Sequence, residues 1–379
     1  MGEPTTGSDA QAEGLMALYE RAGYVRVAPA LLQPAEPFLD LSGEDIRRRM
    51  YLTSDPEGRE LCLRPDLTIP VSHLYLASPE AGEAAGYCCL GPVFRHRGGD
   101  QAAEFVQADI ESFGRRDTAA ADAEMLSLGL DATAHYGIDA PEIRMGDVGL
   151  FAALIEALEL SPAWKRRLKK HFNHLGSLES DLDSLVRSAS KERAEYQGVL
   201  TALAGSDPKA ARALVTDLLS IAGITTVGGR TVGEIAERFL EQSALGAGKL
   251  PQETRSVIER FLAVTGDPDE AADALRRLAA DAGLNIDAAL DLFESRTGFL
   301  AARGIEVARV KFSTAFGRGL DYYTGFVFEM HDAEQRIDRP LIGGGRYDGL
   351  LTRLGASEPI PAVGFAVWIE RLAEIGGAA

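Results

Sequence analysis

The sequence has few cysteines, no long apolar run and no excess of positive charge. Its three cysteines, Cys62, Cys88 and Cys89, are odd in number and two are adjacent, which argues against a disulfide framework and leaves no metal-ligand spacing. No segment approaches the roughly 20 consecutive apolar residues of a membrane span. Residues 1–10 lack the basic and then apolar segments of a secretory signal. These absences predict a protein of a reducing, cytoplasmic compartment, with no metal and no membrane association.

The net negative charge of the chain argues against one class of partner, nucleic acids. The net charge is −18 at pH 7, whereas proteins that bind nucleic acids use clustered positive charge to neutralise phosphates. We therefore expect no nucleic-acid partner. One local exception is the basic segment WKRRLKKHFNHL, whose apolar residues fall on a helical stripe of Trp164, Leu168, Phe172 and Leu175. This helix is either an ordinary solvated face or a docking surface for an acidic partner.

The order of the predicted elements indicates an α+β fold with a helical insertion. Residues 11–160 and 305–379 carry strand and helix patterns, whereas nearly all of residues 161–304 fit amphipathic helices. We expect the two outer segments to form one core, residues 161–304 an inserted helical subdomain, and residues 1–10 a flexible N-terminus. Within the core, the prolines of residues 24–39 predict extended segments and turns instead of a helix.

Two strand pairs are predicted inside the core, at residues 51–63 and 86–114. In the second strand of the later pair, Gln107, Asp109 and Glu111 alternate with apolar residues. A period of two is typical of a strand with one polar face. Because residues four apart lie on the same face of a strand, Gln107 and Glu111 can meet one ligand.

Three other motifs each allow two interpretations. RPDLT, with Asp66 and Thr68, fits a receptor for an ammonium group or the cap of a following helix. RGLDYYTG, with Arg318, Tyr322 and Tyr323, fits a carboxylate or phosphate receptor or a surface hairpin. GGGRYDGL lacks the lysine and hydroxyl residue of a P-loop. Its glycines indicate a close approach of the backbone to a ligand or to a neighbouring strand.

The order of these motifs resembles the catalytic core of histidyl-tRNA synthetase, a class II aminoacyl-tRNA synthetase. The resemblance covers most of residues 12–145 and 305–375 and depends on six segments in order: PALLQPAEPF, LCLRPDLTIPV, GPVFRHR with FVQADIESFG, RGLDYYTG, GGGRYDGLL and PAVGFAVWIERL. It implies the class II antiparallel sheet flanked by helices. It also implies a homodimer, formed through the proline-rich segment near Pro29.

The resemblance further implies a pocket for histidine. Asp66 suits the ammonium group of that ligand, Arg318 suits its carboxylate, and Glu111 with the tyrosines suits its imidazole. No catalytic residue, cofactor or metal is implied. The residues of this sequence that match the pocket or its motifs are Asp66, Thr68, Arg95, Gln107, Glu111, Arg318, Tyr322 and Tyr323.

Three features depart from the synthetase pattern. The sequence ends shortly after WIERL, so we expect no anticodon-binding domain. The loop after Arg97 contains Asp100 and Glu104, which would repel a triphosphate. The net charge of −18 disfavours tRNA. A core that keeps an amino-acid pocket without the tRNA apparatus is similar to the family of ATP phosphoribosyltransferase regulatory subunits, paralogues of the synthetase.

The second resemblance implies a chain that is not catalytic by itself. Members of that family join a short-form catalytic ATP phosphoribosyltransferase in hetero-octamers, which perform the first step of histidine biosynthesis and are inhibited by L-histidine. Two alternatives stay open. One is a truncated synthetase-like ligase that activates histidine with ATP, because Arg95 and Arg371 remain at motif positions. The other is a binding module of the RNA-associated or kinase-sensing kind.

Overall fold

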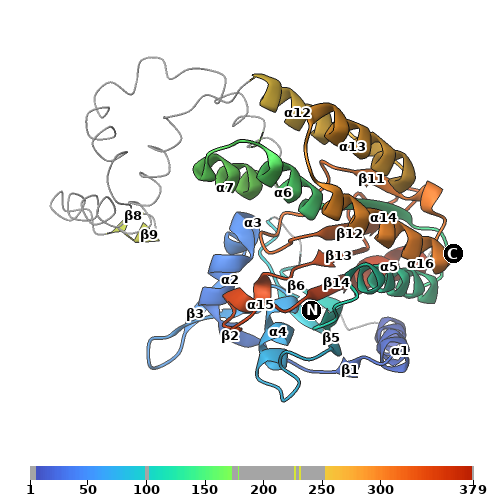
Figure 1. The fold of residues 1–379 in the computed structure, drawn as a ribbon. Helices are drawn as coiled ribbons and strands as arrows, with labels where there is room; N and C mark the ends of the chain where they lie inside the picture. Colours follow the sequence, from blue (N-terminus) through green and yellow to red (C-terminus); the bar gives the residue numbers. More distant parts are fainter. Residues whose placement is uncertain are drawn as a thin grey trace. The chain divides into compact units, whose positions relative to one another are not determined.

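The computed structural model describes residues 6–98, 102–172 and 252–377, together with Leu178 and two strands of two residues each, at 226–227 and 230–231. The chain divides into two compact units (Figure 1). The first unit comprises Met1–Ala153 and Arg260–Ala379, and the second unit comprises Leu154–Glu259.

A nine-stranded sheet forms the centre of the first unit, in the order β1-β5-β6-β14-β13-β12-β7-β11-β10 (Figure 1). The pairs β1–β5 and β11–β7 are parallel, and every other pair is antiparallel. This sheet confirms the predicted α+β fold. Its strands are β1 (Val25–Arg26), β5 (Ala85–Phe94), β6 (Glu104–Phe113), β7 (Glu142–Asp147), β10 (Thr265–Gly266), β11 (Lys311–Ser313), β12 (Phe326–His331), β13 (Ile342–Arg346) and β14 (Ala362–Trp368).

Strands β5 and β6 form the predicted antiparallel pair. Their register places Gly91 opposite Gln107 and Tyr87 opposite Glu111. On its other edge β6 pairs with β14, where Gly364 lies opposite Glu111. Strand β6 therefore lies between β5 and β14, away from the edges of the sheet. The side chains of its polar face project from one side of the sheet.

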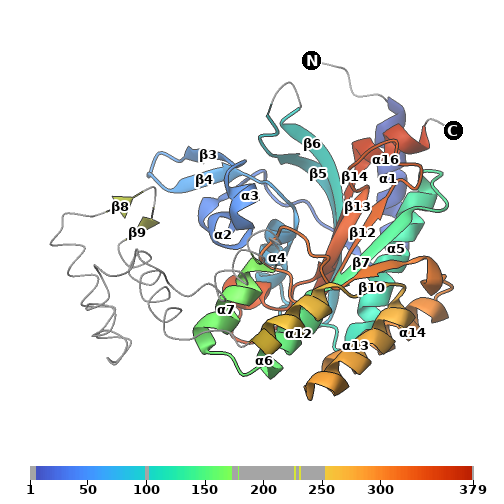
Figure 2. The same cartoon turned by 90° about the horizontal axis from the view of Figure 1, so that it is seen from above.

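Helices cover both faces of this sheet, as Figure 2 shows. On one side, α5 lies against β12, β13 and β14, α14 lies against α5, and α1 and α16 cover β6. On the other side, α4 lies against β6. The helices of this unit are α1 (Thr6–Arg21), α2 (Ala35–Leu41), α3 (Gly43–Arg47), α4 (Thr68–Leu76), α5 (Thr118–His135), α13 (Pro268–Ala282), α14 (Asp287–Ala302), the 3-10 helix η1 (Val307–Arg309), α15 (Leu350–Arg353) and α16 (Ile369–Gly376).

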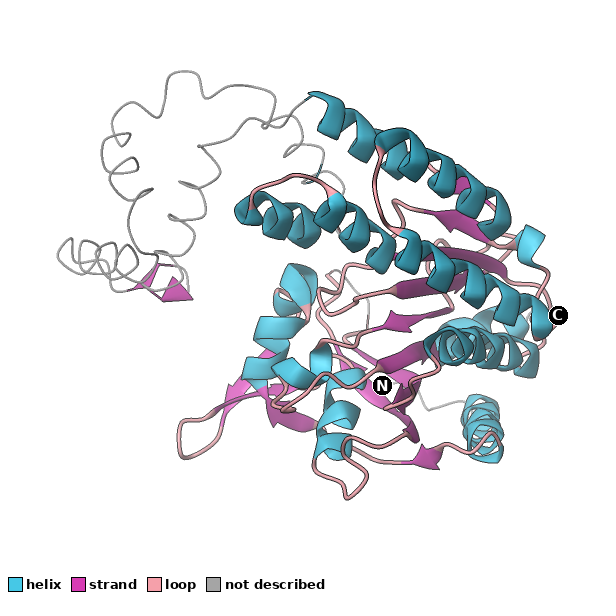
Figure 3. Cartoon of the chain, in the orientation of Figure 1, coloured by secondary structure: helices cyan, strands magenta, loops and turns pink. Residues whose placement is uncertain are grey.

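A smaller sheet lies beside α2 and α3 (Figure 3). It contains β2 (Leu32–Pro34), β4 (Glu60–Leu63) and β3 (Tyr51–Ser54), and the β3–β4 pair is the predicted strand–turn–strand. The expectation that residues 24–39 contain no helix is wrong, because α2 begins at Ala35 and includes Pro37. A proline in the first turn of a helix is tolerated, since the N–H groups there have no partner within the helix.

Two predicted boundaries also need correction. The insertion predicted over 161–304 ends too late, because the second unit ends at Glu259. Both α13 and α14 belong to the first unit, where α14 packs on α5. An amphipathic helix has the same sequence pattern whether it covers a core or another helix, so the pattern could not place this boundary. At the N-terminus, residues 6–10 are helical instead of flexible. Asp9 in the first turn of α1 complements the dipole of that helix.

The segments around the unit boundaries are also helical. They are α6 (Val148–Ala157), α7 (Pro162–His171) and α12 (Gln252–Leu262). In the basic segment, Trp164, Leu168 and Phe172 are buried, as their helical stripe predicts, whereas Leu175 lies outside the described residues. Strands β8 (Thr226–Val227) and β9 (Arg230–Thr231) pair with each other. Among the described residues, no helix combines the length and the apolarity that crossing a membrane requires.

Candidate functional site

A polar cavity of about 220 Å³ lies in the first unit. Its walls include the polar face of β6, the glycines of β13 and β14, and the loop between β11 and β12. The cavity brings together every site residue predicted from the sequence except Glu111. The predicted residues that line it are Asp66, Thr68, Arg95, Gln107, Arg318, Tyr322 and Tyr323.

Strand β6 provides three buried polar side chains in this region. Gln107, Asp109 and Glu111 lie on one face of the strand and are each 1% exposed. Glu111 does not line the cavity itself, but Tyr347, which does, donates a hydrogen bond to it. A Cβ atom at Gly364 would lie 1.6 Å from Glu111 Oε2, so a glycine is needed opposite this carboxylate.

The environment of Glu111 favours its protonated form. Burial is the main cause that raises the pKa of Glu111 to about 8, with a smaller contribution from the Asp66 carboxylate. Hydrogen bonds from Tyr347 and Thr68 act in the opposite direction. Glu111 can therefore exchange a proton near neutral pH when a basic group approaches it.

Asp66 contacts the start of α4 and also lines the cavity. Its Oδ1 accepts a hydrogen bond of 3.3 Å from the backbone N–H of Ile69 in the first turn of α4. Its Oδ2 is buried and has no partner, and the side chain lines the cavity. Burial raises the pKa of Asp66, whereas the positive charge of Arg95 lowers it. One oxygen thus holds the helix and the other is available to a ligand.

Arg318 and two tyrosines come from the loop between β11 and β12. The Arg318 guanidinium lies 3.6 Å from the Glu329 carboxylate and over the rings of Tyr323 and Trp368. A Cβ atom at Gly343 would lie 1.9 Å from Arg318, so this glycine leaves room for the guanidinium. The motif is therefore partly buried at the cavity and is not a surface hairpin.

The glycines of GGGRYDGL have the structural role predicted for them. Gly344 and Gly345 belong to β13, between β12 and β14. A Cβ atom at Gly344 would lie 2.3 Å from the Gly364 carbonyl oxygen, and one at Gly345 would lie 2.4 Å from the Phe326 carbonyl oxygen. These two glycines allow close packing against neighbouring backbone, whereas Gly343 makes room for a residue of the site.

Arg95 also lines the cavity. Its Nε donates a hydrogen bond of 2.6 Å to the Pro65 carbonyl oxygen, which fixes the side chain next to Asp66. Burial lowers the pKa of Arg95, and the Asp66 carboxylate counteracts that effect. The guanidinium therefore contributes a positive charge close to the acidic side chains.

Several buried polar atoms in this region have no hydrogen-bond partner. An unpaired polar atom in the interior is costly, because it has lost water without replacing it. A ligand that is rich in N–H donors and that also carries an anionic group for an arginine would satisfy them. The unpartnered atoms are Asp66 Oδ2, Gln107 Nε2 and Oε1, Asp109 Oδ1 and Oδ2, and Glu111 Oε1. No group of three His, Cys, Asp or Glu side chains in the described part of the chain is arranged to hold a metal ion.

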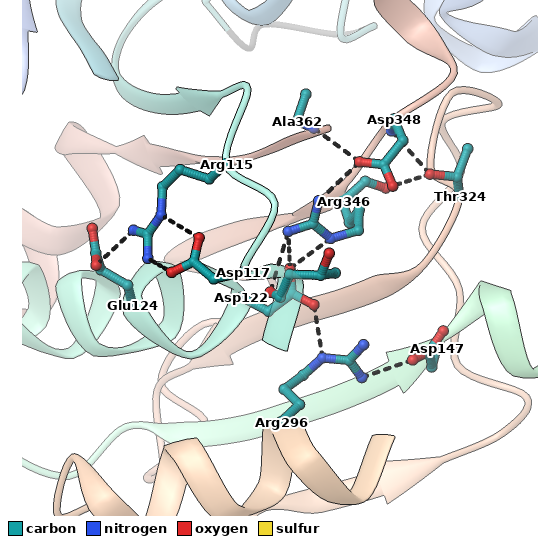
Figure 4. Close-up of polar contacts among 11 residues, drawn as sticks. Arg115, Asp117, Asp122, Glu124, Asp147, Arg296, Thr324, Arg346, Asp348 and Ala362 are labelled. Carbon is teal, nitrogen blue, oxygen red and sulfur yellow. Dashed lines mark hydrogen bonds and ion pairs between the residues drawn. The ribbon is translucent and has the colours of Figure 1, made fainter. Parts of the chain in front are cut away.

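Figure 4 shows a network of ion pairs that involves Arg346 of β13. Asp122 of α5 receives hydrogen bonds from Arg346 of β13 and from Arg296 of α14, each at 2.8 Å. Arg296 also contacts Asp147 at 2.7 Å. Because Arg346 directly precedes Tyr347, the network fixes the strand that presents Tyr347 to Glu111.

The same network holds the tyrosine loop. The Thr324 N–H donates to the Arg346 carbonyl oxygen at 2.8 Å, and the Asp348 N–H donates to the Thr324 hydroxyl at 3.0 Å (Figure 4). Thr324 follows Tyr323 directly in the sequence. The loop that carries Arg318 and the tyrosines is therefore attached to β13 through its last residues.

Several residues of the cavity were not assigned from the sequence, among them Asp109, Glu329, Tyr347 and Trp368. Asp109 had a sequence signal, since it occupies the strand face between Gln107 and Glu111. Tyr347 belongs to GGGRYDGL, where only the glycines were interpreted, and Glu329 and Trp368 had no signal of their own. Their contribution depends on how the sheet brings β12, β13 and β14 together.

Comparison with known proteins gives the class of this fold and site. The family model described as histidyl-tRNA synthetase matches residues 7–225 and 214–372. A structure from Bacillus halodurans C, described as an ATP phosphoribosyltransferase regulatory subunit/histidyl-tRNA synthetase, aligns with a TM-score of 0.68 at 22% identity, covering 99% of this chain and 81% of that one. A histidine–tRNA ligase subunit from Alicyclobacillus acidocaldarius aligns with a TM-score of 0.57 at 25% identity, covering 100% of this chain and 96% of that one. The first unit is thus the class II synthetase-like fold.

Sequence relatives show to which family within the histidyl-tRNA synthetase-like proteins this chain belongs. The chain is 42% identical over 348 residues to the ATP phosphoribosyltransferase regulatory subunit of Brucella canis, with 92% of each protein covered. The protein of the same name from Brucella abortus is also 42% identical, with 92% of this chain and 91% of that protein covered. This chain belongs to the ATP phosphoribosyltransferase regulatory subunit family, within the histidyl-tRNA synthetase-like proteins.

Proposed function

We propose that this chain is the regulatory subunit of a cytoplasmic ATP phosphoribosyltransferase, supports the first step of histidine biosynthesis, and senses L-histidine in the polar cavity. Two kinds of observation support this. Its relatives at 42% identity carry the name of that subunit. The observation that carries the ligand assignment is the group of buried polar atoms without partners around Gln107, Asp109 and Glu111.

Each chemical group of histidine has a complementary residue in the cavity. The ammonium group is assigned to Asp66 Oδ2 with Thr68 and Gln107, because it needs several acceptors. The carboxylate is assigned to Arg318. The imidazole ring is assigned to Glu111 with Tyr322 and Tyr323.

Arg95 is assigned a supporting part. Its Nε already donates to Pro65, so it acts on the ligand through its charge and through its remaining N–H groups. Its positive charge also favours the ionised form of Asp66, which is the form that suits an ammonium group.

In this proposal the chain performs no chemistry by itself. Histidine would act by binding more tightly to one state of the assembly than to another, since only such a difference can shift an equilibrium. The site is made of acceptors and two arginines that hold a ligand in place. Signal transmission would therefore depend on small displacements of the tyrosine loop and of β13.

Two protein partners follow from the same proposal. The first is a short-form catalytic ATP phosphoribosyltransferase chain, with which the subunit would form a hetero-octamer. The second is another copy of this chain. In and beside the small sheet, Leu31, Leu32 and Leu52 are 45%, 50% and 50% accessible, with Leu32 and Leu52 on opposite faces of the sheet. Exposed apolar residues are suited to a self-complementary contact.

Two binding measurements test this function. Isothermal titration of L-histidine into the chain, alone and mixed with the catalytic subunit, should give saturable binding. Sedimentation of the mixture should give a species larger than either component. If histidine does not bind under either condition, the sensing function is lost. If the two chains stay separate, the regulatory function is lost.

One observation favours a second candidate, a ligase that activates histidine with ATP. A second cavity of about 480 Å³ has Arg97, Arg339 and Arg371 in its lining, beside the acidic residues Asp338, Glu370 and Glu374. Burial, together with the charges of Arg97 and Arg339, lowers the pKa of Arg371 to about 10. Such a cluster suits a phosphorylated ligand. Histidine-dependent exchange of pyrophosphate into ATP would support the ligase, whereas its absence would support the regulatory subunit.

A further inference from the structure

Asp109 is the acidic residue of the cavity without an assigned task. It lies between Gln107 and Glu111 on the polar face of β6, is 1% exposed, and lines the cavity. Neither of its carboxylate oxygens has a hydrogen-bond partner. Unpaired buried carboxylates are rare, because the loss of hydration is not compensated. A ligand that supplies donors at this position would compensate for that loss.

The unpartnered acceptor atoms of the cavity call for N–H donors. Among the residues that line it, Asp66 Oδ2, Gln107 Oε1 and both oxygens of Asp109 are buried without a partner. The ammonium group is assigned to Asp66 and Gln107, so Asp109 is left for the ring. A protonated ring has two N–H groups, which lets it donate to Asp109 and to a second acceptor at once.

The charges of the residues around the cavity also favour a ligand with a protonated ring. Asp66, Asp109 and Glu111 contribute three carboxyl groups to the region. The two arginines of the cavity are partly engaged already, since Arg318 lies 3.6 Å from Glu329 and Arg95 donates to Pro65. The ammonium group of the ligand can neutralise only one carboxylate. A second positive charge, on the side chain of the ligand, would neutralise another.

We propose that Asp109 is a ligand-binding residue, and that the cavity takes an α-amino acid whose side chain is positively charged when bound, which for histidine is the imidazolium form. This inference rests on the proposed function. Asp109 then distinguishes ligands by charge, whereas Glu111 and the tyrosines fit the shape of the ring.

The proton that the ring acquires has a source in the empty cavity. Burial raises the pKa of Asp109 well above its usual range, and the neighbouring Glu111 and Asp66 carboxylates raise it further. When histidine enters, a carboxyl O–H bond breaks and an imidazole N–H bond forms, so that a carboxylic acid and a neutral ring become a carboxylate and an imidazolium ion. No proton has to come from the solvent.

Charged and titratable groups from several elements act on Asp109. The basic groups favour its ionised form, and the acidic groups favour its protonated form. These groups are Glu111 on β6, Cys89 on β5, Arg64 after β4, Asp66 before α4, Arg95 after β5, Tyr19 on α1, and Arg318 and Tyr323 in the tyrosine loop.

The state of the bound ring can be measured directly. Histidine labelled with ¹⁵N in the ring is added to the wild-type chain at pH 8, where free histidine has a neutral ring, since its usual pKa is about 6.5. We expect both ring nitrogens of the bound ligand to show the chemical shifts of imidazolium. Asp109→Asn should weaken histidine binding on the order of tenfold to a hundredfold, and any ring it binds should be neutral.

Two controls separate binding from folding. Asp338→Asn removes an exposed carboxylate, whose side chain is 96% accessible, and should leave affinity and ring state unchanged. The unfolding midpoint of Asp109→Asn without ligand should equal or exceed that of the wild type at pH 8, because the variant buries no unpaired carboxyl group. A purely structural role of Asp109 would instead lower that midpoint.

A neutral ring in the wild-type complex, or an unchanged affinity of Asp109→Asn, would overturn the inference and leave histidine sensing intact. If the proposed function itself is wrong, the binding measurement gives a different result. The wild-type chain would then bind no labelled histidine, with or without the catalytic subunit, and both proposals would fall.

Discussion

Asp66 and Glu111 are both buried carboxyl groups, but their neighbours give them different properties. Asp66 is anchored by a backbone N–H and lies beside the positive charge of Arg95, which favours its ionised form. Glu111 is held by the Tyr347 hydroxyl between two strands, and its pKa is raised to about 8. One carboxyl group thus suits an ammonium group, whereas the other can change its charge when a ring binds.

The raised pKa of Glu111 predicts how stability varies with pH. Between the unfolded pKa of about 4.3 and the folded value of about 8, the folded chain keeps a proton that the unfolded chain releases. The free energy of unfolding should therefore fall as the pH rises through this range, with a contribution of up to about 1.4 kcal/mol per pH unit from this group. In Glu111→Gln this contribution is absent.

Urea unfolding of the wild type and of Glu111→Gln, at intervals from about pH 5 to about pH 8, measures this effect. The wild type should lose stability more steeply than the variant as the pH rises. Glu57→Gln, at a side chain that is 68% accessible, should follow the wild type. Parallel slopes for the wild type and Glu111→Gln would show that Glu111 does not hold the proton.

Arg318 should contribute to the binding of the ligand's carboxylate and not to the binding of its ring. Because it is assigned to the carboxylate, Arg318→Ala should weaken binding of L-histidine about tenfold to a hundredfold. Histamine, which lacks the carboxylate, should bind the variant and the wild type with similar affinity. Titration calorimetry with both ligands measures the difference. Arg309→Ala, at a side chain that is 65% accessible, serves as the control, and an equal loss for histamine would contradict the assignment.

Sequence patterns found the residues that repeat within one element and missed those that come together through the fold. Gln107 and Glu111 followed from the period of a strand, and Asp109 could have been included for the same reason. Tyr347 could not be predicted as a partner of Glu111, because β13 and β6 are far apart in the sequence and meet only through β14. The ion pairs of Arg296 have the same explanation.

At the scale of elements, one buried network joins two helices to the sheet. Asp122 of α5 lies between Arg346 of β13 and Arg296 of α14, and all three side chains are nearly inaccessible to solvent. Removing one partner of such a network leaves buried charges without compensation. The network also fixes β13, which presents Tyr347 to the site.

Asp122→Asn should therefore destabilise the chain by about 3–5 kcal/mol. Asp117→Asn, in the same region, breaks an ion pair to Arg115 whose carboxylate side chain is 55% accessible, and should cost no more than about 1 kcal/mol. Urea unfolding of both variants provides the comparison (Figure 4). Equal effects would mean that the buried network contributes no special stability.

Element boundaries were harder to predict than element types. The strand pair at β5 and β6 was evident from alternation, since one face is polar and the other is apolar. The short helix α2 was missed because prolines normally prevent helices, although Pro37 falls in the first turn, where the loss of its N–H has little effect. The placement of α14 was missed because its contacts with α5 are not encoded in its own periodicity.

For the whole molecule, the proposed contact with a second copy can be tested at the small sheet. Leu32 and Leu52 are each 50% accessible, which is costly for an isolated chain. A Leu32→Glu, Leu52→Glu double variant should convert a dimer into a monomer by burying charge at the contact. Leu292→Glu, at a residue of α14 that is 37% accessible, is the control and should remain dimeric. Light scattering after size exclusion gives the masses, and a dimeric double variant would place the contact elsewhere.

The most direct test of the account is the activity of the reconstituted complex. A short-form catalytic ATP phosphoribosyltransferase is assayed for the joining of ATP to phosphoribosyl pyrophosphate, alone, with this chain, and with this chain and increasing L-histidine. We predict that this chain raises the rate and that histidine lowers it again in a saturable manner. A rate that does not respond to this chain, or an increase that histidine leaves unchanged, would contradict the account.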